Sequence, residues 1–158
     1  MTEPPGFLPS KLVLTRDWDR DIESLYKQFS ADFKASCPRY SGRAVIHDRR
    51  QKDGKELAFW HLVTRGDYRD YAGTPDYDRA ERLPWVRALI EHADEPGVRC
   101  WEYHEGSGAV RTYIWYEGGD FAVVLEPLSR GAVRLITAFY IQSDMRRKEM
   151  KSKYARRV

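Results

Sequence analysis

The segment from Val98 to Gln142 constrains the fold more than any other part of the sequence. Four stretches rich in β-branched and aromatic residues follow one another there, separated by short glycine-containing turns at 106–108, 118–120 and 129–131. Turns this short join neighbouring strands that run in opposite directions, so the segment predicts an antiparallel meander. The predicted strands are 98–105, 110–117, 121–128 and 132–142.

Two helices are predicted before this meander and one after it. From Asp17 to Ser36, apolar residues recur every three or four positions and form one stripe, which Pro38 ends. A second helix begins at Pro84, because proline fits the first turn of a helix. A third begins near Ser143 and has a strongly basic composition.

A hairpin is predicted between the first two helices. Residues 43–48 predict a short strand, 52–55 a turn and 56–65 a longer strand, while 66–77 predict a loop. Together these elements predict one α+β domain over residues 1–158, with an antiparallel sheet of about four to six strands and the helices packed on one face. The other face would stay open to a substrate.

Composition narrows the class of protein. Hydrophobic residues make up 42% of the chain and charged residues 32%. The chain is therefore too apolar to be disordered, and charged residues interrupt it too often for it to span a membrane. The first ten residues hold no long apolar run, which predicts a cytoplasmic protein without a signal peptide. The two cysteines, Cys37 and Cys100, lie far apart and predict neither a disulfide framework nor a thiolate zinc site.

Positive charge is concentrated at the C-terminal end. Residues 145–158 carry seven Lys or Arg and one Glu, a local charge of +6 within a net charge of +3 for the chain. A basic helix of this kind attracts phosphates, RNA or an acidic partner. An alternative interpretation is a solvated helix face that keeps the protein soluble.

Several common sites are excluded by their missing motifs. The sequence has no phosphate-binding GxxxxGK[ST] loop, no GxGxxG turn and no nucleophile elbow, so no nucleotide cofactor is predicted. The four histidines lack HxxxH spacing, so no metal site is predicted and any catalysis would depend on side chains. These histidines are His47, His61, His92 and His104.

Three segments hold the candidate site residues. On the strand predicted over 56–65, His61 and Arg65 would share a face about 13 Å apart. A lone strand histidine is, however, more often a hydrogen-bonded structural residue than a catalyst. The segment 79–85 brings two arginines to a helix start, where Glu81 would favour the positive end of the dipole. In the last strand, alternation places Thr137 on one face and Arg134 with Tyr140 on the other.

The motifs FWHLVTR, RAERLPW, IWYEGGDFAVVLEPL and LITAFY, taken in this order, resemble the phage-associated nucleases grouped with barnase, EndoU, colicin and RelE toxins. The similarity covers roughly residues 44–147. It implies a barnase/RelE-like ribonuclease fold, RNA as substrate and a cognate inhibitor protein as a further partner. The catalytic residues that it implies are His61, Arg82, Thr137 and Tyr140, with Arg65 as an addition. Arg65 and Arg134 are predicted as phosphate-binding residues from their charge.

These residue types suit metal-independent RNA cleavage. The reaction needs a base for the 2′-hydroxyl proton, an acid for the leaving 5′-oxygen, and cations for the charge on the phosphorane. Histidine titrates near neutral pH, so His61 suits either proton-transfer role. Arg82, with Arg65 or Arg134, would hold the phosphate. Thr137 would orient a phosphate oxygen, and Tyr140 would stack on a base or form a hydrogen bond to a phosphate.

The first hypothesis is therefore a toxin-like endoribonuclease that leaves a 2′,3′-cyclic phosphate. A second is a non-catalytic module that binds nucleic acid or protein through the basic end and tryptophans such as Trp60, Trp101 and Trp115. A third is an interaction or immunity-type protein of a mobile element, for which the sheet is only a scaffold. A fold resemblance does not decide among them, because function depends on the site.

Overall fold

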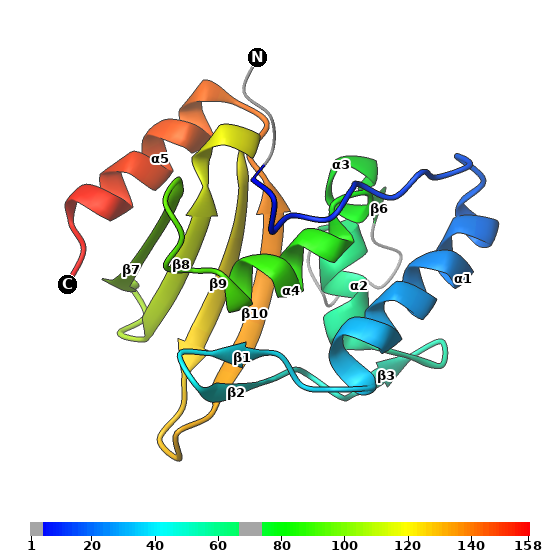
Figure 1. Ribbon diagram of the computed structural model, residues 1–158, viewed down its shortest axis with the longest axis horizontal. Coiled ribbons are helices and arrows are strands. Elements are labelled where there is room, and N and C mark those ends of the chain that lie inside the picture. Colours follow the sequence, from blue (N-terminus) through cyan, green and yellow to red (C-terminus); the bar gives the residue numbers. More distant parts are fainter. Residues whose placement is uncertain (1–4, 67–73) are drawn as a thin grey trace.

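A mixed six-stranded sheet forms the centre of the computed structural model, which describes residues 5–66 and 74–158. The strands lie in the order β1, β2, β10, β9, β8 and β7 (Figure 1). Each long strand pairs antiparallel with the next along the chain, which confirms the predicted meander. These strands are β7 (Val98–His104), β8 (Val110–Tyr116), β9 (Phe121–Pro127) and β10 (Val133–Tyr140).

The sequence predicts an entirely antiparallel sheet, but the observed sheet contains one parallel pair of strands. The short strands β1 (Arg39–Tyr40) and β2 (Arg43–Ile46) pair antiparallel with each other, but β2 runs parallel to β10. Val45 lies opposite Val133 in this pair. The predicted partner of β2 was the segment after the 52–55 turn, which is helical, so β2 completes its hydrogen bonds on β10 instead.

The prediction of a long strand over 56–65 is wrong. The turn does form, because β3 (Gln51–Lys52) pairs with β4 (Lys55–Glu56), but the chain then enters helix α2 (Leu57–Val63). Short apolar runs such as this one do not distinguish a strand from a buried helix by periodicity. The remaining residues, β5 (Thr64–Arg65), pair with β6 (Thr74–Pro75). Most of the predicted 66–77 loop lies outside the described residues.

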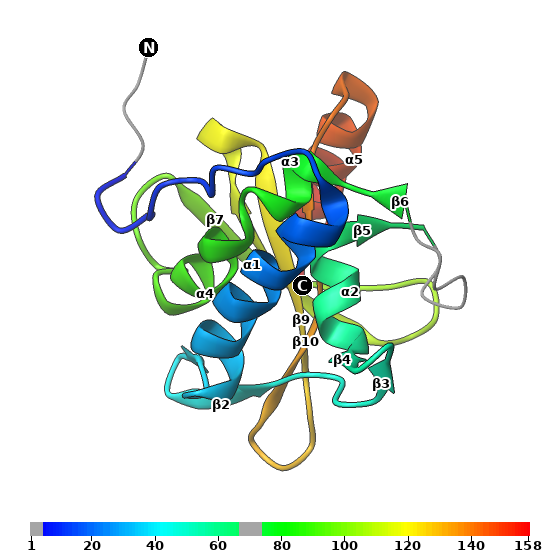
Figure 2. The same cartoon turned by 90° about the vertical axis from the view of Figure 1, so that its right-hand side faces the viewer.

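Helices α1, α2 and α4 cover one face of the sheet and bury the larger core. α1 (Trp18–Phe29) continues into a π-helical turn (Ser30–Lys34), and α4 (Leu83–Glu91) has its proline in the first turn, so both predicted helices are confirmed. They pack with α2 on this face, and α1 lies between α4 and α2 in Figure 2. The short helix α3 (Tyr77–Ala80) precedes α4.

The C-terminal helix α5 (Asp144–Ala155) lies on the opposite face (Figure 1). Its basic helical character is as predicted, but the expectation that all helices share one face is wrong. Trp101, Tyr113 and Trp115 project from β7 and β8 on this side, and Met150 of α5 packs on them to form a second core. Because aromatic side chains lie on both faces of the sheet, helices must cover both faces. The expected open face is therefore partly covered by α5.

Candidate functional site

A positively charged cavity of about 300 Å³, called here the arginine cavity, lies where α2 meets β10. Its lining brings together side chains from the loop after β2, from α2, and from β8 and β10. The polar members of this lining are Asp48, Arg50, His61, Arg111 and Arg134. These segments are distant in sequence, so the cavity exists only in the folded chain.

His61 contributes to this cavity from α2 and is half-buried. Asp48 brings a carboxylate to the lining and accepts hydrogen bonds from Arg50 Nε at 3.0 Å and Arg50 Nη2 at 2.7 Å. These bonds hold the pKa of the Asp48 carboxyl below its usual range, and a positive charge on His61 acts in the same direction. Asp48 is therefore an ionised group close enough to His61 for the two charges to interact.

Two arginines of the cavity share the carboxylate of Glu126. Arg134 Nη2 lies 2.8 Å from one oxygen, and Arg111 Nε lies 3.6 Å from the other. Arg111 Nε is buried and has no hydrogen-bond partner among the described residues. Two guanidinium groups against one carboxylate leave an excess positive charge, and a buried unsatisfied donor is costly unless an acceptor arrives. The arrangement therefore favours an anionic ligand.

A second, smaller cavity of about 130 Å³ lies between α5 and strands β8–β10 and is called here the apolar cavity. Arg111 and Ile136 line both cavities, so the two adjoin. Thr137 lines the apolar cavity. The cavities together form a continuous surface from α2 to α5.

A β-bulge in β10 corrects the predicted orientation of the last strand. The register of β10 on β9 shifts between Leu135 and Thr137. Arg134 pairs with Glu126 and Thr137 with Val124, which occupy alternate positions of β9 and so share a face. The bulge therefore turns Arg134 and Thr137 to the same side, where strict alternation had separated them, and sends Tyr140 to the other side.

Arg82 and Tyr140 lie together but line neither cavity. The Arg82 guanidinium lies 4.2 Å from the Tyr140 ring centroid and donates to the Asp78 carbonyl oxygen at 2.8 Å and to Glu81 Oε1 at 3.0 Å. Arg82 is only 8% exposed. These contacts connect α3 and α4 to β10, so Arg82 has a structural role.

Arg65 also lies outside both cavities, on the exposed strand β5. The prediction that it shares a strand face with His61 is wrong, because α2 carries His61 and ends at Val63. Of the six predicted residues, the structure gathers three at the adjoining cavities: His61, Arg134 and Thr137.

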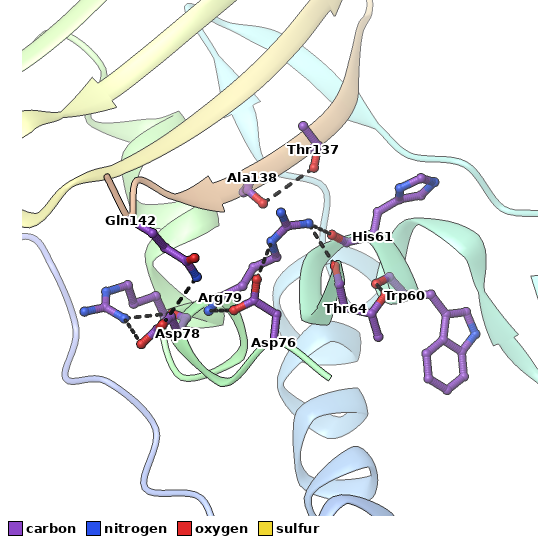
Figure 3. A network of polar contacts seen from close by, with 10 residues as sticks. Trp60, His61, Thr64, Asp76, Asp78, Arg79, Thr137, Ala138 and Gln142 are labelled. Carbon is purple, nitrogen blue, oxygen red and sulfur yellow. Dashed lines mark hydrogen bonds and ion pairs between the residues drawn. The ribbon is translucent and has the colours of Figure 1, made fainter. Parts of the chain in front are cut away.

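Arg79 is a positioning residue that sequence reasoning missed. Its Nη1 donates to the carbonyl oxygens of His61 and Thr64, each at 2.9 Å, so it holds the C-terminal end of α2 (Figure 3). Burial lowers the pKa of Arg79, Asp76 opposes this shift, and the nearby charges of Arg146 and Arg65 add to it. The sequence placed Arg79 in a noted arginine pair but did not indicate its role, because a carbonyl-bonded arginine has no characteristic spacing.

Asp48, Arg50 and Arg111 were also missed. Each belongs to an ordinary charged stretch of a loop or strand, and only the fold brings them beside His61. Within residues 5–66 and 74–158, no group of three or more His, Cys, Asp or Glu side chains is placed to hold a metal ion. In the same ranges, no helix combines the length and apolar character that a membrane crossing requires.

Comparisons with family models, curated proteins and solved structures found no match. The expected likeness to the barnase/RelE fold therefore stays a prediction.

Proposed function

We propose that the chain is a ribonuclease that cleaves RNA without a metal ion, with the scissile phosphodiester bound in the arginine cavity. One observation carries the proposal: His61 shares this cavity with Arg50, Arg111, Arg134 and the Asp48 carboxylate. The cavity thus combines groups that transfer protons with groups that bind phosphate.

The chemistry assigns a role to each group. The 2′-oxygen attacks the phosphorus, the bond from phosphorus to the 5′-oxygen breaks, and a 2′,3′-cyclic phosphate remains. Asp48 accepts the 2′-hydroxyl proton, and its negative charge stabilises a protonated His61 that donates a proton to the leaving oxygen. Arg111 and Arg134 stabilise the charge that develops on the phosphorane.

Thr137 stands beside this centre rather than in it, because it lines the adjoining apolar cavity. Its hydroxyl makes a long contact of 3.5 Å with the Ala138 carbonyl oxygen, which is weak enough for the hydroxyl to turn toward a phosphate oxygen. Arg82, Tyr140 and Arg65 have no role in this proposal, since they line neither cavity.

The test is an RNA-cleavage assay in EDTA with analysis of the product ends. Wild type is expected to release 2′,3′-cyclic phosphates, and His61→Ala is expected to lose about 10² to 10⁴ in rate. His104→Ala is the matched control, because His104 is exposed at the end of β7 and lines neither cavity. Circular dichroism checks the fold of each variant.

The outcomes separate the competing functions. Full activity of a folded His61→Ala variant would remove His61 from the mechanism. Wild type that binds RNA but never cleaves it would instead make the chain an RNA-binding module.

A further inference from the structure

The lining of the apolar cavity combines two chemically different sets of side chains with the Thr137 hydroxyl. The apolar set, called here the floor, includes the half-buried ring of Phe139 and consists of Tyr113, Val124, Ile136, Phe139 and Met150. The charged set, called here the rim, consists of Arg111, Arg146, Glu149 and Lys153. This combination suits a ligand that is flat and apolar on its faces and forms hydrogen bonds at its edges.

The size of the cavity is consistent with a ring system. It measures about 130 Å³, whereas a single water molecule needs only about 10–15 Å³ on a comparable measure. The space is thus far larger than one ordered water would occupy. Because the floor is apolar, water there would find few hydrogen-bond partners and would be displaced at little cost.

The position of the cavity indicates what the ring is attached to. Arg111 and Ile136 line both cavities, so a ligand that filled both would join an aromatic part to an anionic part. A nucleotide has this composition. We propose that the apolar cavity binds a nucleobase of the RNA strand whose phosphate lies in the arginine cavity, an inference that rests on the proposed function.

Phe139 and Arg146 supply the stacking surfaces. The Arg146 guanidinium lies 5.2 Å from the Phe139 ring centroid, and the Arg146 side chain is 57% exposed and so able to move. An entering base takes the place of the guanidinium on the ring, and Arg146 then stacks on the outer face of the base. Glu149, 3.6 Å from Arg146, offers carboxylate oxygens to the donors on the edge of the base.

The Lys153 ammonium on the rim is already engaged. Lys153 Nζ donates to the Tyr113 hydroxyl at 2.8 Å, and that hydroxyl donates to Glu105. This network fixes α5 against the sheet and keeps one wall of the cavity in place. Recognition of the base edge therefore depends on the Glu149 carboxylate.

Calorimetric titration of the full chain tests the proposal, with the four 5′-mononucleotides and with ribose 5-phosphate, which lacks the base. At least one mononucleotide is expected to bind about tenfold more tightly than ribose 5-phosphate, because stacking on an aromatic side chain is worth about 1–3 kcal/mol per base. Equal affinity for all five ligands would overturn the base-binding cavity.

Phe139→Leu is the decisive variant, since it removes the aromatic ring but keeps an apolar side chain on the floor. It is expected to abolish most of the preference for the mononucleotide and to leave ribose 5-phosphate binding unchanged. Tyr116→Leu is the matched control, because Tyr116 is a half-buried strand aromatic that packs against the other core. A mononucleotide preference that survives Phe139→Leu would also overturn the proposal.

The design keeps this inference separate from the proposed function. Mononucleotide binding that depends on Phe139, in a protein that cleaves no RNA, would support the base cavity and refute the ribonuclease. RNA cleavage that depends on His61, in a protein that binds no mononucleotide more tightly than ribose 5-phosphate, would refute the base cavity alone. Failure of all five ligands to bind would refute both the base cavity and the phosphate-binding arginine cavity.

Discussion

The Arg79 guanidinium caps the helix end that carries His61, with 2.9 Å between Arg79 Nη1 and the His61 carbonyl oxygen. The last carbonyl groups of a helix have no partner within the helix, so an arginine that bonds two of them fixes both the helix end and the side chain it bears. The orientation of His61 in the arginine cavity therefore depends on a residue that does not line the cavity.

Arg79→Ala is expected to lower the free energy of unfolding by about 1–3 kcal/mol, because it leaves the part-buried carbonyl groups of His61 and Thr64 without this donor. Urea unfolding measures this difference. Arg130→Ala, an exposed arginine in the turn between β9 and β10, is the control and should leave stability unchanged. If Arg79→Ala were as stable as this control, the proposed anchoring of α2 would be wrong.

Glu56→Gln is expected to make stability less sensitive to acid. The Glu56 carboxylate is buried, which opposes its ionisation, but hydrogen bonds from Lys34 at 3.1 Å and Tyr26 at 2.9 Å hold its pKa below the ordinary 4.5. A lowered folded-state pKa gives stability that is present above the unfolded-state value and is lost as the pH falls through the folded-state value.

Wild type should therefore exceed Glu56→Gln in stability by about 1–3 kcal/mol at neutral pH. The gap should close as the pH falls below 4.5. Urea unfolding across this pH range measures the difference. A gap that stayed constant with pH would show that the Glu56 charge contributes nothing.

Glu126→Gln is expected to strengthen RNA binding, because its carboxylate competes with phosphate for Arg111 and Arg134. A partly exposed ion pair is worth about 0.2–1 kcal/mol, so the expected gain is about 1.4- to 5-fold. A 2′-deoxy oligonucleotide, which lacks the attacking hydroxyl, allows equilibrium binding to be measured by anisotropy. Weaker binding by the variant would indicate that Glu126 orients the two arginines rather than competing for them.

The exposed basic residues of α5 are expected to contribute to the salt dependence of RNA binding. Lys148 and Lys151 are both exposed, and replacing both with Ala should reduce the slope of log affinity against log salt by about 0.7 for each phosphate that is no longer neutralised. Substitution is preferable to deletion, because Tyr154 packs against Trp101 and a truncated helix would expose the second core. An unchanged slope would assign these lysines to solubility.

The sequence predicted the meander and helices α1, α4 and α5 well, because their turns, proline positions and apolar spacing are local signals. It did not predict α2, whose aromatic run is compatible with either a strand or a buried helix. The parallel pairing of β2 with β10 was missed for the same reason, since an incorrect strand had been assigned as the partner of β2.

The candidate site was predictable only in part. His61 was named from a family resemblance and from its residue type, Arg134 from its residue type alone, and the fold places both in one cavity. Arg111 and Asp48 carry no local signal, and the bulge that turns Thr137 toward the cavities is invisible to a rule of strict alternation. Contacts between distant segments decide such a site, and periodicity does not report them.

The pairing of β2 with β10 also affects the order in which the protein can mature during synthesis. Val45 leaves the ribosome long before its partner Val133, so β2 cannot join the sheet until β10 has been synthesised. Arg134 belongs to that same strand and completes the arginine cavity. A nascent chain would thus already carry His61 and Arg111 yet lack Arg134, so the proposed activity would begin only after β10 has been made.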